Sequence, residues 1–309
     1  MIETHLSLLL VVIPLLAAPV AAILPNGRLP WLLTLLVSWL CFALAIWQFL
    51  LVMDGNVISY ELGGWAPPWG IEYRIDTVNA FVALIVAGMA AITLPYAMLS
   101  VEQEIAKDKL SLFYATFLLC MDGLLGITLT GDIFNLFVFL EISSLSTYAL
   151  ISMGRQRRAL TAAYQYLIMG TIGATFLLIG IGLIYAETGT LNMTDLSARL
   201  PAVFEHRTVH TAFAFIVVGV GLKLAMFPLH LWLPNAYTYS PSAVTVFLAA
   251  TATKVAVYVM LRLVFTVFSI GFAYVTPTDD MFMLVGALGV IVASIYAIYQ
   301  QDAKRLLAY

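Results

Sequence analysis

Long apolar runs separated by short polar segments extend along the whole chain. An apolar run of about 18 or more residues is long enough to cross the hydrocarbon core of a bilayer as a helix. The runs lack the alternating, period-two pattern of a transmembrane β-barrel. We therefore predict an all-α, polytopic membrane protein. Its nine spanning segments are expected at about residues 6–24, 31–53, 77–99, 110–130, 132–153, 159–186, 209–228, 240–270 and 280–300.

The segments between these runs predict where loops lie and where helices begin. The longest connection, 54–76, is rich in glycine, proline and aromatic residues, whose rings suit the membrane–water interface. The connection 187–208 is expected to hold a short surface helix that starts at Thr194-Asp195. Asp132 is expected to cap the fifth spanning helix. Ser240, which Pro241 follows, is expected to cap the eighth.

Composition and charge narrow the class of protein further. The chain is 62% hydrophobic and 10% charged, with a formal net charge of −3, whereas soluble domains are about 45–50% apolar and about 25% charged. The absence of a basic block argues against nucleic acid as a partner. Cys41 and Cys120 lie in apolar runs, so we interpret them as core residues and not as a disulfide or metal pair. The first run lacks the basic flank of a secretory signal and is expected to be a retained helix.

The basic residues in the loops predict an orientation in the membrane. Three lie on the side of the N-terminus: Arg74, Arg199 and Arg207. Eight lie on the opposite side: Arg28, Lys107, Lys109, Arg155, Arg157, Arg158, Lys304 and Arg305. Because loops with excess Lys and Arg stay in the cytoplasm, we expect the N-terminus outside and the C-terminus inside a bacterial-type cytoplasmic membrane.

Glu141 is a carboxylate inside the fifth apolar run, and hydroxyl-bearing residues follow it at positions 143, 144 and 146–148. By helical spacing, Leu145 and Tyr148 share its face. A charged side chain at bilayer depth costs at least ~2.5–3.5 kcal/mol, so such residues are rare and usually functional. We favour a carboxyl group that gains and loses a proton over the alternative, a structural ion pair that joins two helices.

Lys223 lies in the seventh run, after Gly219 and Gly221, which allow a neighbouring backbone to approach closely. Pro228 then breaks the helix. Broken backbone within a membrane lines protein or a wet cavity and marks ion paths in transporters. This break favours function over a lysine that simply reaches for the interface. His230 follows the break; it could relay protons or lie at the interface, and both interpretations stay open.

Lys254 is the third charge at bilayer depth and the main functional candidate of the three. Thr251, Lys254, Tyr258 and Arg262 are spaced to form one polar stripe, which is expected to face protein or water. Arg262, near the end of its run, could serve only as an anchor. Asp122, in the fourth run, is expected either to pair with a lysine or to approach the interface. A carboxyl, two amines and an imidazole on different helices predict a lateral path for protons or cations.

Three segments of the chain carry a resemblance to a known family: 131–141 with Glu141, 223–236 with its lysine, proline and histidine, and 253–255 with Lys254. They resemble the antiporter-like subunits shared by multisubunit Na⁺/H⁺ (Mrp-type) antiporters and by the membrane arm of respiratory complex I and related hydrogenases. Segments 63–71 and 302–309 fit the same family. Among its branches, the chain looks most like the D-type member of the Mrp antiporters.

The resemblance implies a fold of about fourteen helices with two inverted five-helix units. It implies three parts here: an N-terminal three-helix segment (1–109), a first unit with a broken helix (110–270) and the start of a second unit (271–309). Helices ten onward are missing, so either a second chain continues the fold or the sequence is a fragment. Glu141 would pair with Lys223, Lys254 would pass protons onward, and His230 would match the histidine after the break.

By this resemblance the chain would exchange protons for Na⁺ or another monovalent cation. Its partners would be other small and large hydrophobic subunits of a membrane complex. One alternative is a proton-pumping subunit of a redox-driven complex of the NADH–quinone oxidoreductase or membrane-bound hydrogenase type. Another is a scaffold that transports nothing. We expect no cofactor, no metal and no catalytic nucleophile in this chain.

Overall fold

The computed structural model describes residues 5–309, and helices dominate it. Nine helices in this range are long and apolar enough to cross a membrane. They are α1 (Leu6–Ile23), α2 (Arg28–Val52), α3 (Thr77–Glu104), α4 (Leu110–Leu129), α5 (Ile133–Ser152), α6 (Arg157–Thr188), α8 (Arg207–Leu224), α10 (Ser242–Leu261) and α12 (Thr278–Ile298). Each overlaps one predicted segment, so the prediction of an all-α, multi-pass membrane protein is confirmed.

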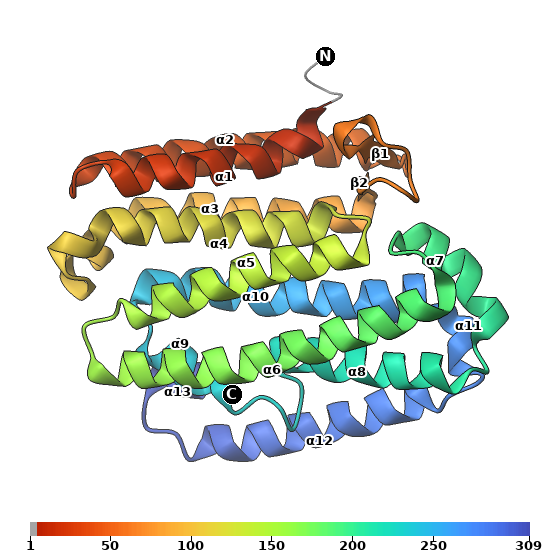
Figure 1. Ribbon diagram of the computed structural model, residues 1–309. Coiled ribbons are helices and arrows are strands. Elements are labelled where there is room, and N and C mark those ends of the chain that lie inside the picture. Colours follow the sequence, from red (N-terminus) through yellow and green to blue (C-terminus); the bar gives the residue numbers. More distant parts are fainter. Residues whose placement is uncertain (1–4) are drawn as a thin grey trace.

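The long helices lie side by side in a bundle, with their axes nearly parallel or antiparallel (Figure 1). In this view α1 and α2 form one edge, α3 and α4 follow, α5 and α10 lie in the middle, and α6 and α8 come next. The apolar stretch of α4 is 83% buried, whereas that of α12 is 0% buried. The centre of the bundle therefore lies around α4, and α12 runs along its margin.

A β-hairpin covers one end of the bundle, which we call the hairpin end. Its strands β1 (Ile58–Glu61) and β2 (Glu72–Ile75) pair antiparallel within the segment predicted as a loop. The carboxylate of Glu72 is buried and accepts hydrogen bonds from the Ser59 hydroxyl (2.6 Å) and the Asn192 amide (2.7 Å). Asn192 in turn caps α7 (Met193–Arg199). This is the short surface helix predicted near Thr194, which is thus confirmed.

The two predicted helix caps have different outcomes. The Asp132 side chain accepts a hydrogen bond from the amide of Asn135 (2.7 Å), so its capping of α5 is confirmed. The Ser240 prediction is wrong, because α10 begins after Pro241 and Ser240 still belongs to the extended end of α9 (Trp232–Tyr239). The first amide of α10, at Ser242, instead donates to the carboxylate of Glu104 at the end of α3 (2.6 Å).

The predicted break in the seventh spanning segment lies between α8 and α9. Helix α8 ends at Leu224, and Ala225 adopts a left-handed conformation with φ 60°. Proline disfavours helical geometry in the residue before it, so the helix stops ahead of Pro228. The break frees carbonyl groups at the end of α8. The indole N–H of Trp232 donates to one of them, that of Leu222 (2.9 Å).

Helix α10 does not run straight through the predicted segment 240–270. A π-helical stretch, Arg262–Val267, follows α10, and Ser269 then has φ 61° at the start of α11 (Ser269–Ala273). Arg262 forms an ion pair with Asp76, the cap of α3 (2.7 Å). The remaining elements are short: 3₁₀ turns at Leu62–Gly64, Lys107–Lys109 and Leu200–Val203, and the terminal helix α13 (Ala303–Ala308).

Candidate functional site

An ion pair inside the bundle joins α5 to the last turn of α8. The Nζ atom of Lys223 lies 3.3 Å from Oε1 of Glu141. Only 6% of the Lys223 side chain and 26% of the Glu141 side chain are exposed. The lysine therefore does not reach for the interface, and the structure brings together the two residues that the sequence singled out on these helices.

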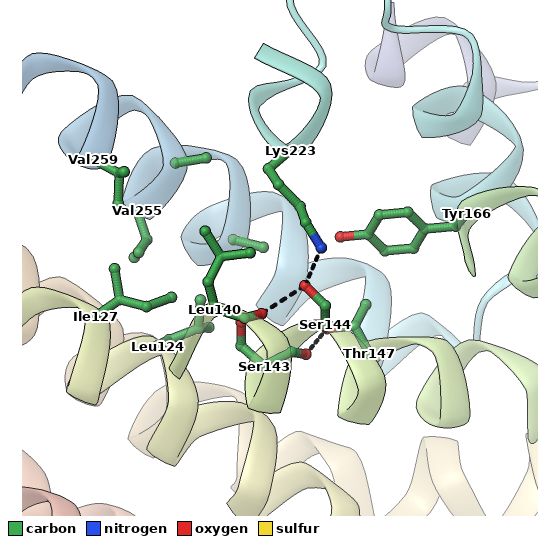
Figure 2. A pocket seen from close by; sticks show the side chains of 12 residues that line it. Leu124, Ile127, Leu140, Ser143, Ser144, Thr147, Tyr166, Lys223, Val255 and Val259 are labelled. Carbon is green, nitrogen blue, oxygen red and sulfur yellow. Dashed lines mark hydrogen bonds between the residues drawn. The ribbon is translucent and has the colours of Figure 1, made fainter. Parts of the chain in front are cut away.

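Two hydroxyl groups complete the surroundings of the Lys223 ammonium. Its Nζ donates to Oγ of Ser144 (2.6 Å) and to the Tyr148 hydroxyl (3.2 Å). An ammonium group has three protons, so Glu141, Ser144 and Tyr148 can accept all of them. The hydroxyl of Tyr166 also points toward this ammonium (Figure 2).

These acceptors lie on the α5 face that carries Glu141. Tyr148 shares that face, as predicted, but Leu145 does not, because its side chain is 56% exposed. Ser144, three residues after Glu141, takes that place beside the lysine. The sequence showed a run of hydroxyls here without indicating which of them contact Lys223.

Glycines allow α8 to bring Lys223 close to α6. A methyl group on Gly219 would lie 2.7 Å from the carbonyl oxygen of Gly173 in α6. Such a contact is shorter than real carbon–oxygen contacts, so the two backbones meet where side chains are absent. The predicted close approach at Gly219 is confirmed. Tyr166 of α6 also stacks on Trp232 of α9, with ring centroids 3.8 Å apart, and so ties α6 to both sides of the break.

A small cavity adjoins the ammonium of Lys223. Its volume is about 30 Å³, and polar atoms of Ser144, Thr147 and Tyr166 line it together with Lys223. The opposite wall is apolar and comes from α4, α5 and α10 (Figure 2). A cavity needs roughly 10–15 Å³ and at least two polar partners to hold a water molecule. The space beside Lys223 meets both conditions.

Lys254 does not join this pair. Its side chain is exposed, and its Nζ donates to the Ala249 carbonyl (2.6 Å) and the Thr253 hydroxyl (3.4 Å) of its own helix. Thr251 and Tyr258 are buried, so the predicted single stripe is split. The physical reason is the helical period, which turns Lys254 about 60° away from Thr251. Within the part of the chain that the structure describes, no carboxylate lies within ion-pair distance of Lys254.

Asp122 follows neither of the alternatives that the sequence left open. Its side chain has 0% exposure, so it does not approach the interface. Neither carboxyl oxygen has a hydrogen-bond partner among residues 5–309, so it pairs with neither Lys223 nor Lys254. A buried, unpartnered carboxyl group is costly when charged.

His230 lies in the break, away from Lys223. Both ring nitrogens are buried and have no hydrogen-bond partner in the described range. The ring packs near Phe227 and Tyr309, with centroids 5.7 Å and 6.4 Å away. It lines a cavity of about 170 Å³ between the break and Gly289 of α12. The two cysteines, by contrast, are free thiols in the packed core, as predicted.

Comparison with known proteins shows which family has this site. Residues 130–309 match the family model described as NADH:quinone oxidoreductase/Mrp antiporter, transmembrane. The chain belongs to this family. It is 42% identical over 308 residues to NADH-quinone oxidoreductase subunit N of Desulforudis audaxviator, covering 99% of this chain and 61% of that one. It is 30% identical over 259 residues to the D-type member of the Na(+)/H(+) antiporter of Bacillus subtilis, covering 84% and 51%.

Solved structures of family members share the fold. The membrane-bound sulfane sulfur reductase, an archaeal respiratory membrane complex, contains a chain that matches with a TM-score of 0.90 and 32% identity, covering 99% of this chain and 62% of that one. The Mrp complex from Dietzia sp. matches with a TM-score of 0.86 and 26% identity, covering 100% and 56%. This chain thus spans only about half to three-fifths of its relatives' length. The predicted resemblance is confirmed, and relatives come from both of its branches.

Proposed function

We propose that this chain translocates protons, in exchange for Na⁺ or another monovalent cation, as an antiporter-like subunit of a larger membrane complex. The observation that carries the proposal is the buried Lys223 ammonium, which contacts one carboxylate and two hydroxyls inside the bundle. Ionisable groups at bilayer depth mark proton and ion pathways. Membership in a family whose named members include Na⁺/H⁺ antiporter subunits supports the same function.

Proton transfer at the pair follows from its electrostatics. Unit charges about 4 Å apart attract by roughly 4 kcal/mol at an effective dielectric constant near 20. When Glu141 takes up a proton, the Lys223 ammonium loses this attraction and keeps only Ser144 and Tyr148. Its own proton is then easier to release toward the adjoining cavity. Moving one charge across 100 mV involves about 2.3 kcal/mol, so the pair and the membrane potential can be coupled.

The other candidates extend this path. We propose that Lys254 accepts protons that leave Lys223 and passes them to groups on other parts of the complex. Its exposed side chain is open to such a partner. We further propose that His230 relays protons at the cavity beside the break. Asp122 would be a buried carboxyl that changes its protonation state.

We also propose the division of the chain and its placement in the cell. A three-helix segment (1–109) would precede a five-helix unit (110–270), and 271–309 would begin a second unit. The membrane would be a bacterial cytoplasmic membrane, with the N-terminus outside and the C-terminus inside. The excess of basic residues in loops opposite the N-terminus supports this orientation. Other hydrophobic subunits would surround the chain, as the multisubunit complexes among its structural relatives suggest.

Proton flux in vesicles that carry the complete complex tests the proposal. Glu141→Gln should abolish most of the cation-dependent flux, because glutamine cannot take up the proton. Glu61→Gln is the matched control, since Glu61 is exposed on β1. Flux that survives Glu141→Ala and Lys254→Ala would instead establish the scaffold alternative.

A proton-pumping subunit of a redox-driven complex is the second candidate function. The 42% identity to a NADH-quinone oxidoreductase subunit favours it. The two functions differ in what drives the flux. An electron donor should drive proton flux in a redox complex, and a Na⁺ gradient should drive it in an antiporter. Neighbouring genes for iron–sulfur subunits, or for small hydrophobic antiporter subunits, would separate the two as well.

A further inference from the structure

Gly170, in the middle of α6, faces the ion pair from the side opposite α5. It is buried, and it is not one of the residues that the sequence singled out. A methyl group on its Cα would lie 2.8 Å from Cζ of Tyr148 and would collide with the hydroxyl oxygen of that tyrosine. The same methyl group would lie 3.4 Å from Nζ of Lys223. The Tyr148 hydroxyl therefore occupies the space that a side chain at position 170 would fill.

The remaining contacts of Tyr148 leave its ring few other positions. The side chain is 7% exposed. Its ring meets the ring of Tyr166 edge to face, with centroids 4.6 Å apart and an angle of 84°. Tyr166 is itself held by its stack on Trp232. A group that pushes the hydroxyl away from Gly170 would thus also push it away from Lys223.

We infer that Gly170 is a positioning residue, whose missing side chain holds the Tyr148 hydroxyl against the Lys223 ammonium. Tyr148 supplies one of the three acceptors of that ammonium, at 3.2 Å. Without it, one ammonium proton in a buried place has no partner. The inference deepens the proposed function and rests on it for the effect on transport, whereas the placement of Tyr148 can be tested independently.

Gly182 provides a matched control on the same helix. It is exposed, and a methyl group there would meet nothing within 4 Å. Both substitutions replace a helical glycine with alanine, so both gain the same helix propensity of roughly 1 kcal/mol. A difference between Gly170→Ala and Gly182→Ala then reports the contact with Tyr148 alone.

The test compares infrared spectra and proton flux in the purified complex with ring-labelled tyrosine. The difference between wild type and Tyr148→Phe isolates the C–O band of Tyr148. The difference between Gly170→Ala and Gly170→Ala/Tyr148→Phe isolates the same band in the variant. We expect this band to shift in Gly170→Ala and to stay in place in Gly182→Ala. Loss of a hydrogen bond to a charged group should lower the flux of Gly170→Ala about tenfold.

The double variant also guards against a mere folding defect. Phenylalanine removes the atom nearest to position 170, so Gly170→Ala/Tyr148→Phe should melt at a higher temperature than Gly170→Ala. Its flux should equal that of Tyr148→Phe. An unshifted band in Gly170→Ala, or an equal shift in Gly182→Ala, would overturn the inference. If the band shifts while Glu141→Gln retains full flux, Gly170 still positions Tyr148, and the proposed function is what fails.

Discussion

The two intramembrane lysines of this chain lie in contrasting surroundings. Lys223 is buried and contacts Glu141, Ser144 and Tyr148 from another helix. Lys254 is exposed and contacts only groups of its own helix. Both lie in apolar runs that look alike in the sequence. Residues 5–309 thus build a complete environment for one of the two charges, and the other is open to whatever lies beside α10.

Removal of Lys223 should have the largest effect on this contrast. Lys223→Ala leaves Glu141 inside the bundle without its cation, and breaking a buried pair costs about 3–5 kcal/mol. We expect a loss of flux of at least about a hundredfold and a marked fall in melting temperature. The double variant Glu141→Ala/Lys223→Ala should be more stable than the sum of the single losses predicts. Strict additivity of the two losses would contradict the ion pair.

Removal of Lys254 should separate transport from stability. Exposed side chains usually contribute within about 0.5 kcal/mol, so Lys254→Ala should unfold at nearly the wild-type temperature. The flux should nevertheless fall by about tenfold or more, because a proton acceptor on the path is lost. Lys109→Ala, at an exposed turn before α4, is the control for loss of a surface lysine. A large destabilisation by Lys254→Ala would place this lysine in a structural contact.

Helix α10, which carries Lys254, is tied to α3 at both ends. Arg262 pairs with Asp76 at the hairpin end, and Glu104 caps Ser242 at the other end. Arg262→Ala should destabilise the protein by about 1.5–3 kcal/mol, as expected for a hydrogen-bonded charge, in thermal unfolding of the purified protein. Flux should fall less than in Lys254→Ala. A greater loss of flux than in Lys254→Ala would make Arg262 part of the path and not an anchor.

The smallest effect is expected at the other end of α10. Glu104→Gln removes the negative charge from the helix N-terminus and keeps an oxygen that can accept from Ser242. Such charge–dipole interactions are worth about 0.3–1 kcal/mol. A shift in melting temperature of a few degrees should result, smaller at high salt. Glu102→Gln, near the same end of α3, serves as the control. An unchanged melting temperature would show that the charge of Glu104 does not stabilise α10.

The long helices and the break before Pro228 were predictable, because bilayer length and proline geometry act locally along the chain. The pairing of Glu141 with Lys223 came from the family resemblance, since 82 residues separate the two in sequence. Long-range contacts explain what was missed. Glu104 caps an amide 138 residues away, and Glu72 binds an amide 120 residues away. Gly170 carries no chemical group, so only the space it leaves for Tyr148 reveals it.

Infrared difference spectroscopy of Glu141 tests the central claim most directly. The complete complex in vesicles would be recorded while a proton gradient is imposed and then released. We predict the C=O band of a protonated carboxyl that appears during transport, is absent in Glu141→Gln and is displaced in Lys223→Ala. A spectrum in which Glu141→Gln changes no carboxyl band would show that this carboxylate never takes up a proton, and would contradict proton transfer at the pair.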